Sequence, residues 1–294
     1  HAHAKIRRID VEAAAAAPGV AAIYTGADMA ADNVAAMKTM WAITAPDGSP
    51  MAEPPRYALA RDCVRHVGEP VAFVVADTLA QALDAAELVE VDYETLPSVT
   101  DGARAQDKDA PLLHANAPGN VCFRFGRGDK AKADAGFAKA AHVVSIDLHN
   151  QRIAGVALEP RGAIALPATG HDKLTLYTTT QTPHHIRRQV AEQFGWSEAK
   201  LRVISPDVGG GFGFKGKLYP EESVLPFAAI KLRRPVRWMA SRNESFNSDL
   251  QARDHATHAE LALDDAGKFL ALRVRTVANL GAYISTFGAA IPSA

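Results

Sequence analysis

The sequence predicts a mixed α/β and α+β protein with two regions, and three observations lead to this prediction. Residues 1–95 alternate short strand and helix patterns. Residues 96–120 are rich in Pro, Ala, Asp and Gly without a sustained period, which is typical of an extended connector. Residues 121–294 again alternate strands with helices and finish with two strands around the turn 264–267. A chain of 294 residues has room for about two domains.

The first region contains a strand–helix–strand pattern. The apolar run 71–76 predicts a buried strand. Thr78 then begins a capping box with Gln81, and an apolar stripe at helical spacing indicates a helix. The stripe consists of Leu79, Leu83 and Ala86. Residues 89–94 alternate apolar and acidic side chains, which predicts a half-buried strand.

The second region has longer and more regular patterns. Its expected strands are 121–125, 143–148, 164–166, 174–180, 201–204, 236–239, 256–263 and 270–279. Its expected helices are 130–140, 183–194 and 220–232. The second of these helices has the clearest end signals, with Thr182 as N-cap, Pro183 at the first helical position and Gly195 just past the end.

The composition argues against several classes of protein. The 32 Lys and Arg residues balance 33 Asp and Glu residues, so no net field draws the protein to nucleic acid or to an anionic membrane. No run approaches the roughly 18 apolar residues of a membrane span. Cys63 and Cys122 are too few for a disulfide scaffold or a cysteine-ligated metal cluster.

The two ends of the sequence predict a fragment of a longer protein. The chain begins at His1 without Met or an apolar leader, and it stops at Ala294 shortly after a strongly patterned strand. The missing leader also predicts a cytoplasmic location.

A glycine-rich loop follows the strand predicted at 201–204. Residues 207–215 read Asp-Val-Gly-Gly-Gly-Phe-Gly-Phe-Lys. Glycine lets the backbone bring consecutive N–H groups close to a ligand, so the loop is expected to bind an anion or a polar oxygen. A P-loop is excluded because Lys215 precedes Gly216 rather than Ser or Thr, and a dinucleotide fingerprint is excluded because its third glycine is missing. A flexible surface turn is the simpler alternative, which the phenylalanine among the glycines disfavours.

Gln181 lies where a predicted strand ends and the helix at 183–194 begins. Its amide can donate a hydrogen bond without carrying charge, which suits an anionic oxygen ligand. The N-terminus of the helix adds partial positive charge nearby. Taken alone, a glutamine at such a place is more often an ordinary polar residue beside a helix cap.

The order and spacing of these two motifs resemble the large subunit of molybdenum hydroxylases. This family includes xanthine dehydrogenase, aldehyde oxidase and the large subunit of aerobic carbon monoxide dehydrogenase. The motifs are Thr-Thr-Thr-Gln-Thr-Pro-His at 178–184 and the loop 207–215. Segments 1–6, 157–162 and 278–283 match the family too, so the resemblance covers essentially the whole chain.

The resemblance implies a hammerhead-type α/β domain at 1–95, a connector at 96–120 and the first part of a molybdopterin-binding domain at 121–294. Gln181 matches the glutamine that hydrogen-bonds an oxo ligand of molybdenum. The loop whose backbone faces the metal and its pterin matches Gly210, Gly211, Phe212 and Gly213. Pterin sulfurs hold the metal, so no side chain of this chain is expected to ligate it directly.

The same resemblance implies a reaction and partners. The enzyme would oxidise an aldehyde, an N-heterocycle or CO with oxygen from water. The cofactor would be molybdenum–molybdopterin, as such or as its cytosine dinucleotide. Electrons would leave through an iron–sulfur small subunit and an FAD-binding medium subunit, in a dimer of heterotrimers. The general base lies beyond residue 294 in the family, so no catalytic residue is expected in this chain and the fragment alone is expected to be inactive.

One departure and two alternatives bear on this interpretation. Xanthine-oxidising members carry an acid after the lysine of the loop, whereas Gly216 stands there in this chain, which argues against a purine substrate. The alternatives are an oxidoreductase that binds the phosphate of a nucleotide or flavin at the glycine loop, and a non-catalytic assembly domain in which the loop is structural.

Other polar residues are weaker candidates. Glu221 and Glu222 are expected to be ordinary acids in the first turn of a helix. The pairs His184–His185 and His255/His258 are poor metal sites, since the latter two would face opposite sides of a strand. The basic cluster Lys231, Arg233, Arg234 and Arg237 is expected to be a solvated helix end rather than a nucleic-acid site. For Arg161, a structural role and a cofactor-facing role both remain open.

Overall fold

The computed structural model describes residues 1–168 and 173–293 and has the predicted mixed α/β and α+β architecture. Residues 169–172 and Ala294, which belong to the second predicted region, lie outside the described residues. The helices are α1 (Glu12–Ala15), α2 (Gly26–Ala31), α3 (Leu79–Glu87), α4 (Lys130–Ala138), α5 (Pro183–Phe194), α6 (Pro220–Leu232) and α7 (Arg242–Ser248). Short 3₁₀ turns occur at Arg104–Gln106, Pro118–Asn120, Glu198–Lys200, Phe214–Gly216 and Ile291–Ser293.

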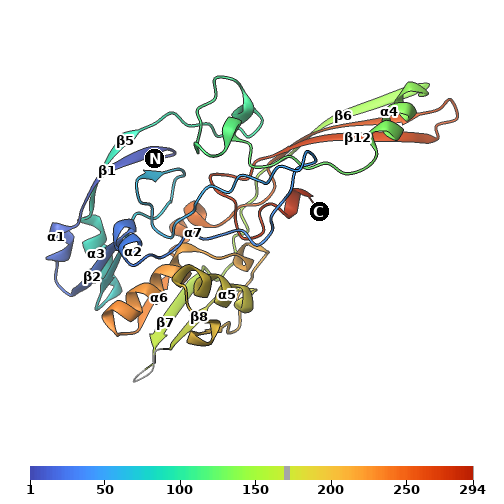
Figure 1. Cartoon of the computed structure of the whole chain (residues 1–294). Coiled ribbons are helices and arrows are strands. Elements are labelled where there is room, and N and C mark those ends of the chain that lie inside the picture. Colours follow the sequence, from blue (N-terminus) through green and yellow to red (C-terminus); the bar gives the residue numbers. More distant parts are fainter. Residues whose placement is uncertain (169–172, 294) are drawn as a thin grey trace.

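Among the described residues, the strands form four separate sheets (Figure 1). They are β1 (Ala4–Asp10), β2 (Val20–Thr25), β3 (Cys63–Val64), β4 (Ala72–Ala76), β5 (Glu90–Thr95), β6 (His142–Asn150), β7 (Gly162–Pro167), β8 (Leu174–Thr178), β9 (Leu201–Ile204), β10 (Val236–Met239), β11 (His255–Leu263) and β12 (Phe269–Ala278). The strand orders are β3-β1-β5, β2-β4, β10-β7-β8-β9 and β12-β11-β6.

In the N-terminal region, the predicted strand–helix–strand elements are present, but the two strands belong to different sheets. β4 pairs with β2, whereas β5 pairs with β1. The capping box at the start of α3 is confirmed, because Thr78 Oγ1 accepts from the N–H of Gln81 at 3.3 Å. The helix that the apolar stripe indicates is present, but the stripe is not its buried face, since Leu79 and Leu83 are 66% and 58% exposed. The small side chain of Ala85 is the fully buried residue of α3 instead, because the helix lies against β4 and α1.

The main core lies between the sheet β10-β7-β8-β9 and the helices α5 and α6. It contains Leu174 and Leu176 from β8, Ile186 and Val190 from α5, and Leu225 from α6. The end signals predicted for α5 are confirmed in position, with Thr182 and Gly195 flanking it and Gly195 left-handed at φ 63°. β8 runs parallel to β9, so the two segments that follow these strands leave the sheet at the same edge.

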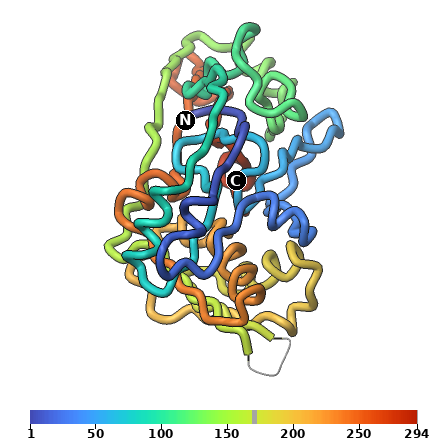
Figure 2. The backbone as a smooth tube through the Cα atoms, turned by 90° about the vertical axis from the view of Figure 1, so that its left-hand side faces the viewer, coloured from blue at the N-terminus to red at the C-terminus, as the bar shows by residue number. Residues whose placement is uncertain are grey.

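A second core joins the N-terminal region to α6. Met29 and Leu59 pack with Val224 and Phe227, and Tyr24 makes an edge-to-face contact with Phe227 at 5.2 Å. Figure 2 shows the N-terminal residues in blue and cyan lying across the middle of the molecule, with the yellow and orange segments below them. The two regions therefore share a core.

The sheet β12-β11-β6 projects from the body as a long arm (Figure 1). α4 packs on one face, where Phe137 lies under the guanidinium of Arg273. The other face is apolar and exposed in this chain; it carries Val144, Ile146, Leu148, Leu272 and Val274. The prediction of a strand at 121–125 is wrong, because this segment has no strand partner; Cys122 and Phe123 pack instead beside Ile43 and Ile284.

Within residues 1–168 and 173–293, no helix has both the length and the apolar character needed to cross a bilayer.

Candidate functional site

The edge of the main sheet places Gln181 beside the glycine loop. Gln181 follows β8 and the loop follows β9, and these strands are parallel neighbours. The carbonyl of Lys215 accepts two hydrogen bonds from this segment, from the N–H of Gln181 at 3.0 Å and from Oγ1 of Thr180 at 2.9 Å. Main-chain contacts thus hold the two predicted motifs together.

The side chain of Gln181 lies directly on the loop backbone. Its Oε1 accepts a hydrogen bond from the N–H of Gly213 at 3.0 Å. A Cβ at Gly211 would come within 2.4 Å of Gln181 Cδ, so only glycine permits this approach. The structure therefore brings together the residues named from the sequence, and their role in holding a cofactor stays a prediction.

The backbone of the loop is strained at Phe212. This residue has φ 45°, between Gly210 at φ 100° and Gly213 at φ 80°. A bulky residue rarely adopts a left-handed conformation, and such strain costs of order 1–3 kcal/mol unless the surroundings impose it. The phenyl ring is 73% exposed and lies over Gly210. An exposed aromatic side chain on a strained backbone is a poor design for a passive surface turn.

Three hydrogen-bond donors of this site are free. Across the described part of the chain, no acceptor meets Nε2 of Gln181 or the backbone N–H groups of Gly211 and Phe212. Oε1 of Gln181 is already bound to Gly213, so the amide nitrogen is turned away from that bond. Uncharged donors grouped in this way fit a ligand with anionic oxygens, as in backbone anion sites.

Lys215, the last residue of the predicted loop, forms an ion pair with Glu159, and the sequence assigns neither side chain a role of its own. Lys215 is 1% exposed, and its Nζ donates to Oε2 and to the carbonyl of Glu159, both at 2.8 Å. The same Oε2 accepts from the N–H of Gly209 at 2.8 Å. Partial burial opposes ionisation of Glu159, but the hydrogen bonds from Lys215 and Gly209 outweigh it and lower its pKa. Segment 157–162 was noted only as part of a resemblance.

Arg161 has a structural role, which decides the question that the sequence left open. It is 4% exposed, and its guanidinium donates to Asp249 at 2.6 Å, to Ser248 at 2.7 Å and to Glu221. The guanidinium also lies 3.8 Å from the ring centre of Tyr219. Burial opposes the charge, but the surrounding carboxylates more than compensate and raise the pKa of Arg161.

Glu222 differs from the exposed first-turn acid that the sequence predicts. It is buried, and it accepts hydrogen bonds from Thr178 Oγ1 at 2.7 Å and from the N–H of Tyr219 at 3.0 Å. Burial, reinforced by the charge of Glu221, raises the pKa of Glu222 to about 8. It links the start of α6 to the end of β8, just before Gln181.

Replacing Glu222 with glutamine is expected to flatten the pH dependence of stability. Because the pKa of Glu222 is raised to about 8 in the folded state, this group favours folding at low pH and loses that contribution as pH rises toward 8. Glutamine does not titrate; its one carbonyl oxygen can accept from the N–H of Tyr219, and its amide nitrogen can donate to Thr178 Oγ1, which a hydroxyl oxygen can accept. Relative to the unaltered protein, the variant should gain about 1–3 kcal/mol of stability between about pH 5 and pH 8.

Urea unfolding across this pH range measures the effect. Glu192→Gln, on the exposed surface of α5, serves as the control because it removes a carboxylate without burial. Parallel stability curves for Glu222→Gln and the unaltered protein would refute the assignment.

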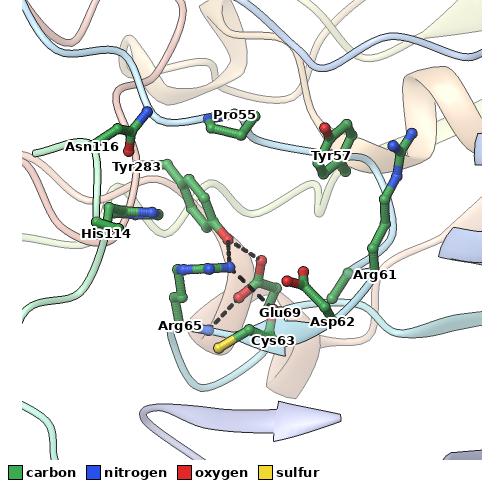
Figure 3. Close-up of a pocket in the computed structure, with 12 residues that line it drawn as sticks. Pro55, Tyr57, Arg61, Asp62, Cys63, Arg65, Glu69, His114, Asn116 and Tyr283 are labelled. Atoms are coloured by element: carbon green, nitrogen blue, oxygen red, sulfur yellow. Dashed lines mark hydrogen bonds between the residues drawn. The ribbon is translucent and has the colours of Figure 1, made fainter.

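A cavity of about 440 Å³ lies between the N-terminal region and the segment after β12 (Figure 3). Arg65, Glu69 and Tyr283 line it in one network: Tyr283 donates to Glu69 at 2.7 Å and accepts from Arg65 at 3.3 Å. His114 lies beside Tyr283, and burial lowers its pKa. None of the residues of the glycine loop lines this cavity, and its main polar groups satisfy one another, so we assign it a structural role.

The remaining weak candidates from the sequence are surface features. Within the basic cluster, Lys231 pairs with Asp32 at 2.6 Å and Arg234 with Asp77 at 3.0 Å, so this helix end contacts the N-terminal region rather than only solvent. The described residues contain no group of three or more His, Cys, Asp or Glu side chains that could hold a metal.

Comparisons with known proteins match both regions. Residues 1–97 match the model of the aldehyde oxidase and xanthine dehydrogenase a/b hammerhead domain, and residues 113–294 match that of the molybdopterin cofactor-binding domain. The chain is 36% identical to the nicotine 6-hydroxylase large subunit of Paenarthrobacter nicotinovorans, covering 96% of this chain and 34% of that protein. It is 37% identical to the carbon monoxide dehydrogenase large chain of Hydrogenophaga pseudoflava, covering 96% and 35%.

A solved structure agrees with these matches. The chain superimposes on CO dehydrogenase from Oligotropha carboxidovorans with a TM-score of 0.85 and 38% identity, covering 94% of this chain and 34% of that one. The chain thus spans about a third of the length of the relatives that it matches.

Proposed function

Because the chain belongs to the molybdenum hydroxylase large-subunit family, with a hammerhead domain followed by a molybdopterin cofactor-binding domain, we propose that Gln181 and the glycine loop form one wall of its cofactor pocket. The single observation that carries this proposal is the contact of the Gln181 side chain with the backbone at Gly211 and Gly213. The free donors beside this contact suit a cofactor rich in anionic oxygens.

Molybdenum held by a molybdopterin would supply the acceptor for two electrons when a small substrate is oxidised with oxygen from water. In this chain, Gln181 Nε2 would offer a neutral hydrogen-bond donor to the bound cofactor, and the hydrogen bond from Gly213 to Oε1 fixes the direction of that amide. The N–H groups of Gly211 and Phe212 offer two more donors at the same wall. A side chain at position 211 would displace Gln181, so glycine keeps the cofactor within reach.

We assign the protein to the class of enzymes that oxidise an aldehyde, an N-heterocycle or CO. Two similar proteins, a nicotine 6-hydroxylase and a carbon monoxide dehydrogenase, already span two of these substrate types. The description of both as a large subunit or chain supports partners, which we propose to be an iron–sulfur and an FAD-binding subunit in a dimer of heterotrimers. The cytosine dinucleotide form of the cofactor, the domain limits at 95 and 120 and a cytoplasmic location are further parts of this proposal.

Metal and pterin analysis of the complete enzyme tests the proposal. We expect about one molybdenum per large subunit by mass spectrometry, together with pterin fluorescence after oxidation. A preparation with neither would contradict the proposal, and bound flavin or nicotinamide on this chain would favour the phosphate-binding alternative instead.

Replacing Gln181 with alanine is expected to lower turnover by about 10- to 100-fold while molybdenum content stays largely intact. The reason is that the neutral donor is lost, whereas the backbone donors and the rest of the pocket still hold the pterin. Steady-state kinetics, normalised to molybdenum per subunit, measure the effect. Unchanged turnover at full occupancy would refute the role given to Gln181.

A further inference from the structure

We propose that Lys215 and Glu159 are positioning residues that hold the Gln181 side chain in place against the glycine loop. This inference rests on the function proposed above and concerns two residues that do not reach the free donors themselves. It depends on hydrogen bonds that connect the loop to Glu159, Lys215 and Gln181 and lead back to the loop.

The first of these contacts is the buried ion pair. The Lys215 ammonium group is fully buried and meets both the carboxylate and the carbonyl of Glu159 at 2.8 Å. A buried lysine needs such partners, because an isolated ammonium group is costly in a dry environment. The position of Lys215 is therefore tied to that of Glu159.

Hydrogen bonds to the backbone of Lys215 hold Gln181 in turn. The carbonyl of Lys215 accepts from the N–H of Gln181, and the Oγ1 of Thr180 bonds the same oxygen. Any movement of the Lys215 backbone therefore moves the backbone of Gln181. The tip of the loop has few other contacts, because Phe212 is largely exposed and Gly213 has open space around it.

Glu159 also binds the start of the loop. Oε2 of Glu159 bonds the N–H of Gly209 as well as Lys215, so one carboxylate oxygen holds both ends of the glycine stretch. Gly213, between these ends, donates to Oε1 of Gln181. One ion pair thus sets the spacing between the Gln181 amide and the free N–H groups of the loop.

Alternative roles fit the contacts less well. Lys215 cannot be a proton donor to a ligand in this arrangement, because its ammonium is fully buried and directed at Glu159. A role in stability alone would not explain why its carbonyl accepts from Gln181, which carries the candidate donor, and from Thr180 beside it. Arg161, another buried cation near the loop, has its hydrogen bonds to Asp249, Ser248 and Glu221 and none to Gln181 in the described structure, as expected for a structural ion pair.

The experiment uses the complete enzyme with Lys215→Met, Gln181→Ala and the double variant. Molybdenum per large subunit and the electron paramagnetic resonance spectrum of the dithionite-reduced metal are the readouts, so no substrate is needed. Lys215→Met is expected to shift the g values in the same direction as Gln181→Ala, with molybdenum retention largely intact as in that variant. The double variant should show no shift beyond that of Gln181→Ala, because Lys215 acts through Gln181.

Lys217→Met is the matched control. This half-buried lysine lies two residues further along and contacts the ring of Phe287 at 4.7 Å rather than the loop. The spectrum of this variant should equal that of the unaltered enzyme. If Lys215→Met does not fold, Glu159→Gln takes its place, because its carboxamide can still accept from Gly209 while the charge that holds Lys215 is gone; a shift in the same direction is expected.

An unchanged spectrum in whichever of Lys215→Met and Glu159→Gln folds would overturn the inference, as would shifts that add independently in the double variant. These outcomes leave the proposed cofactor untouched. An unaltered enzyme without molybdenum would instead overturn the proposed function, and this inference with it.

Discussion

Replacing Gly211 with alanine is expected to reduce turnover of the complete enzyme by about 100-fold with little change in thermal stability. The added Cβ would lie 2.4 Å from Cδ and 2.6 Å from Cγ of Gln181, well inside van der Waals contact. These atoms belong to a flexible exposed side chain, so the clash is relieved by moving Gln181 rather than by unfolding the loop. The amide would then lose its bond to Gly213 and its direction toward the cofactor.

The effect exceeds that of removing the Gln181 amide, because the displaced side chain also occupies space beside the loop. Kinetics normalised to molybdenum, together with a melting curve, separate the two consequences. Gly216→Ala is the matched control, since a Cβ there meets only ordinary contacts, the nearest at 3.8 Å from Thr182. If the loop were a simple surface turn, Gly211→Ala would be neutral or slightly stabilising, and full activity of this variant would contradict the proposed pocket.

Local signals explain why much of the second region could be predicted from sequence. α5 is bounded by Thr182, Pro183 and Gly195, and each acts on the few residues next to it. α6 begins at Pro220 for the same reason. The hairpin of β11 and β12 is joined by a short turn, so its pairing is also a local matter.

Contacts between distant segments explain the failures. The run 121–125 has strand-like residues, but a strand also needs a continuous ladder with a partner, and here the backbone of Cys122 accepts a single hydrogen bond from Ala52. The stripe of Leu79 and Leu83 correctly indicates a helix, yet periodicity cannot say which face meets the body of the protein. The role of Arg161 follows from its ion pairs with Glu221 and Asp249. Both residues lie far along the chain from Arg161, so no local sequence pattern predicts the pairing.

The candidate site could likewise be predicted only in part. Gln181 and the loop could be named from the sequence because their motifs are distinctive and were matched to a family. Their meeting in space follows from the parallel pairing of β8 and β9, which a single sequence does not reveal. Glu159 and Lys215 were missed because a buried ion pair between separate segments has no sequence signature of its own.

Replacing Arg161 with methionine is expected to give the largest loss of stability, about 3–5 kcal/mol. The guanidinium has three separate hydrogen-bonding partners, and its removal would leave the buried carboxylates of Glu221 and Asp249 without the cation that directly hydrogen-bonds them. Lysine cannot restore the site, because a single ammonium group cannot reproduce the planar fork that reaches all three partners. A fall in melting temperature of roughly 5–15 °C should accompany the change.

The loss is expected to reach the glycine loop. Arg161 stacks on Tyr219, whose hydroxyl donates to the carbonyl of Phe214 at 3.1 Å. Arg188→Met is the control for losing an arginine, since its pair with Glu192 is exposed to solvent and should contribute little to stability. Scanning calorimetry of both variants measures the difference, and amide hydrogen exchange at 209–216 shows whether the loop loosens. Equal melting temperatures for the two variants would mean that the buried network around Arg161 does not stabilise this domain. Unchanged hydrogen exchange at 209–216 would mean that this network does not support the glycine loop.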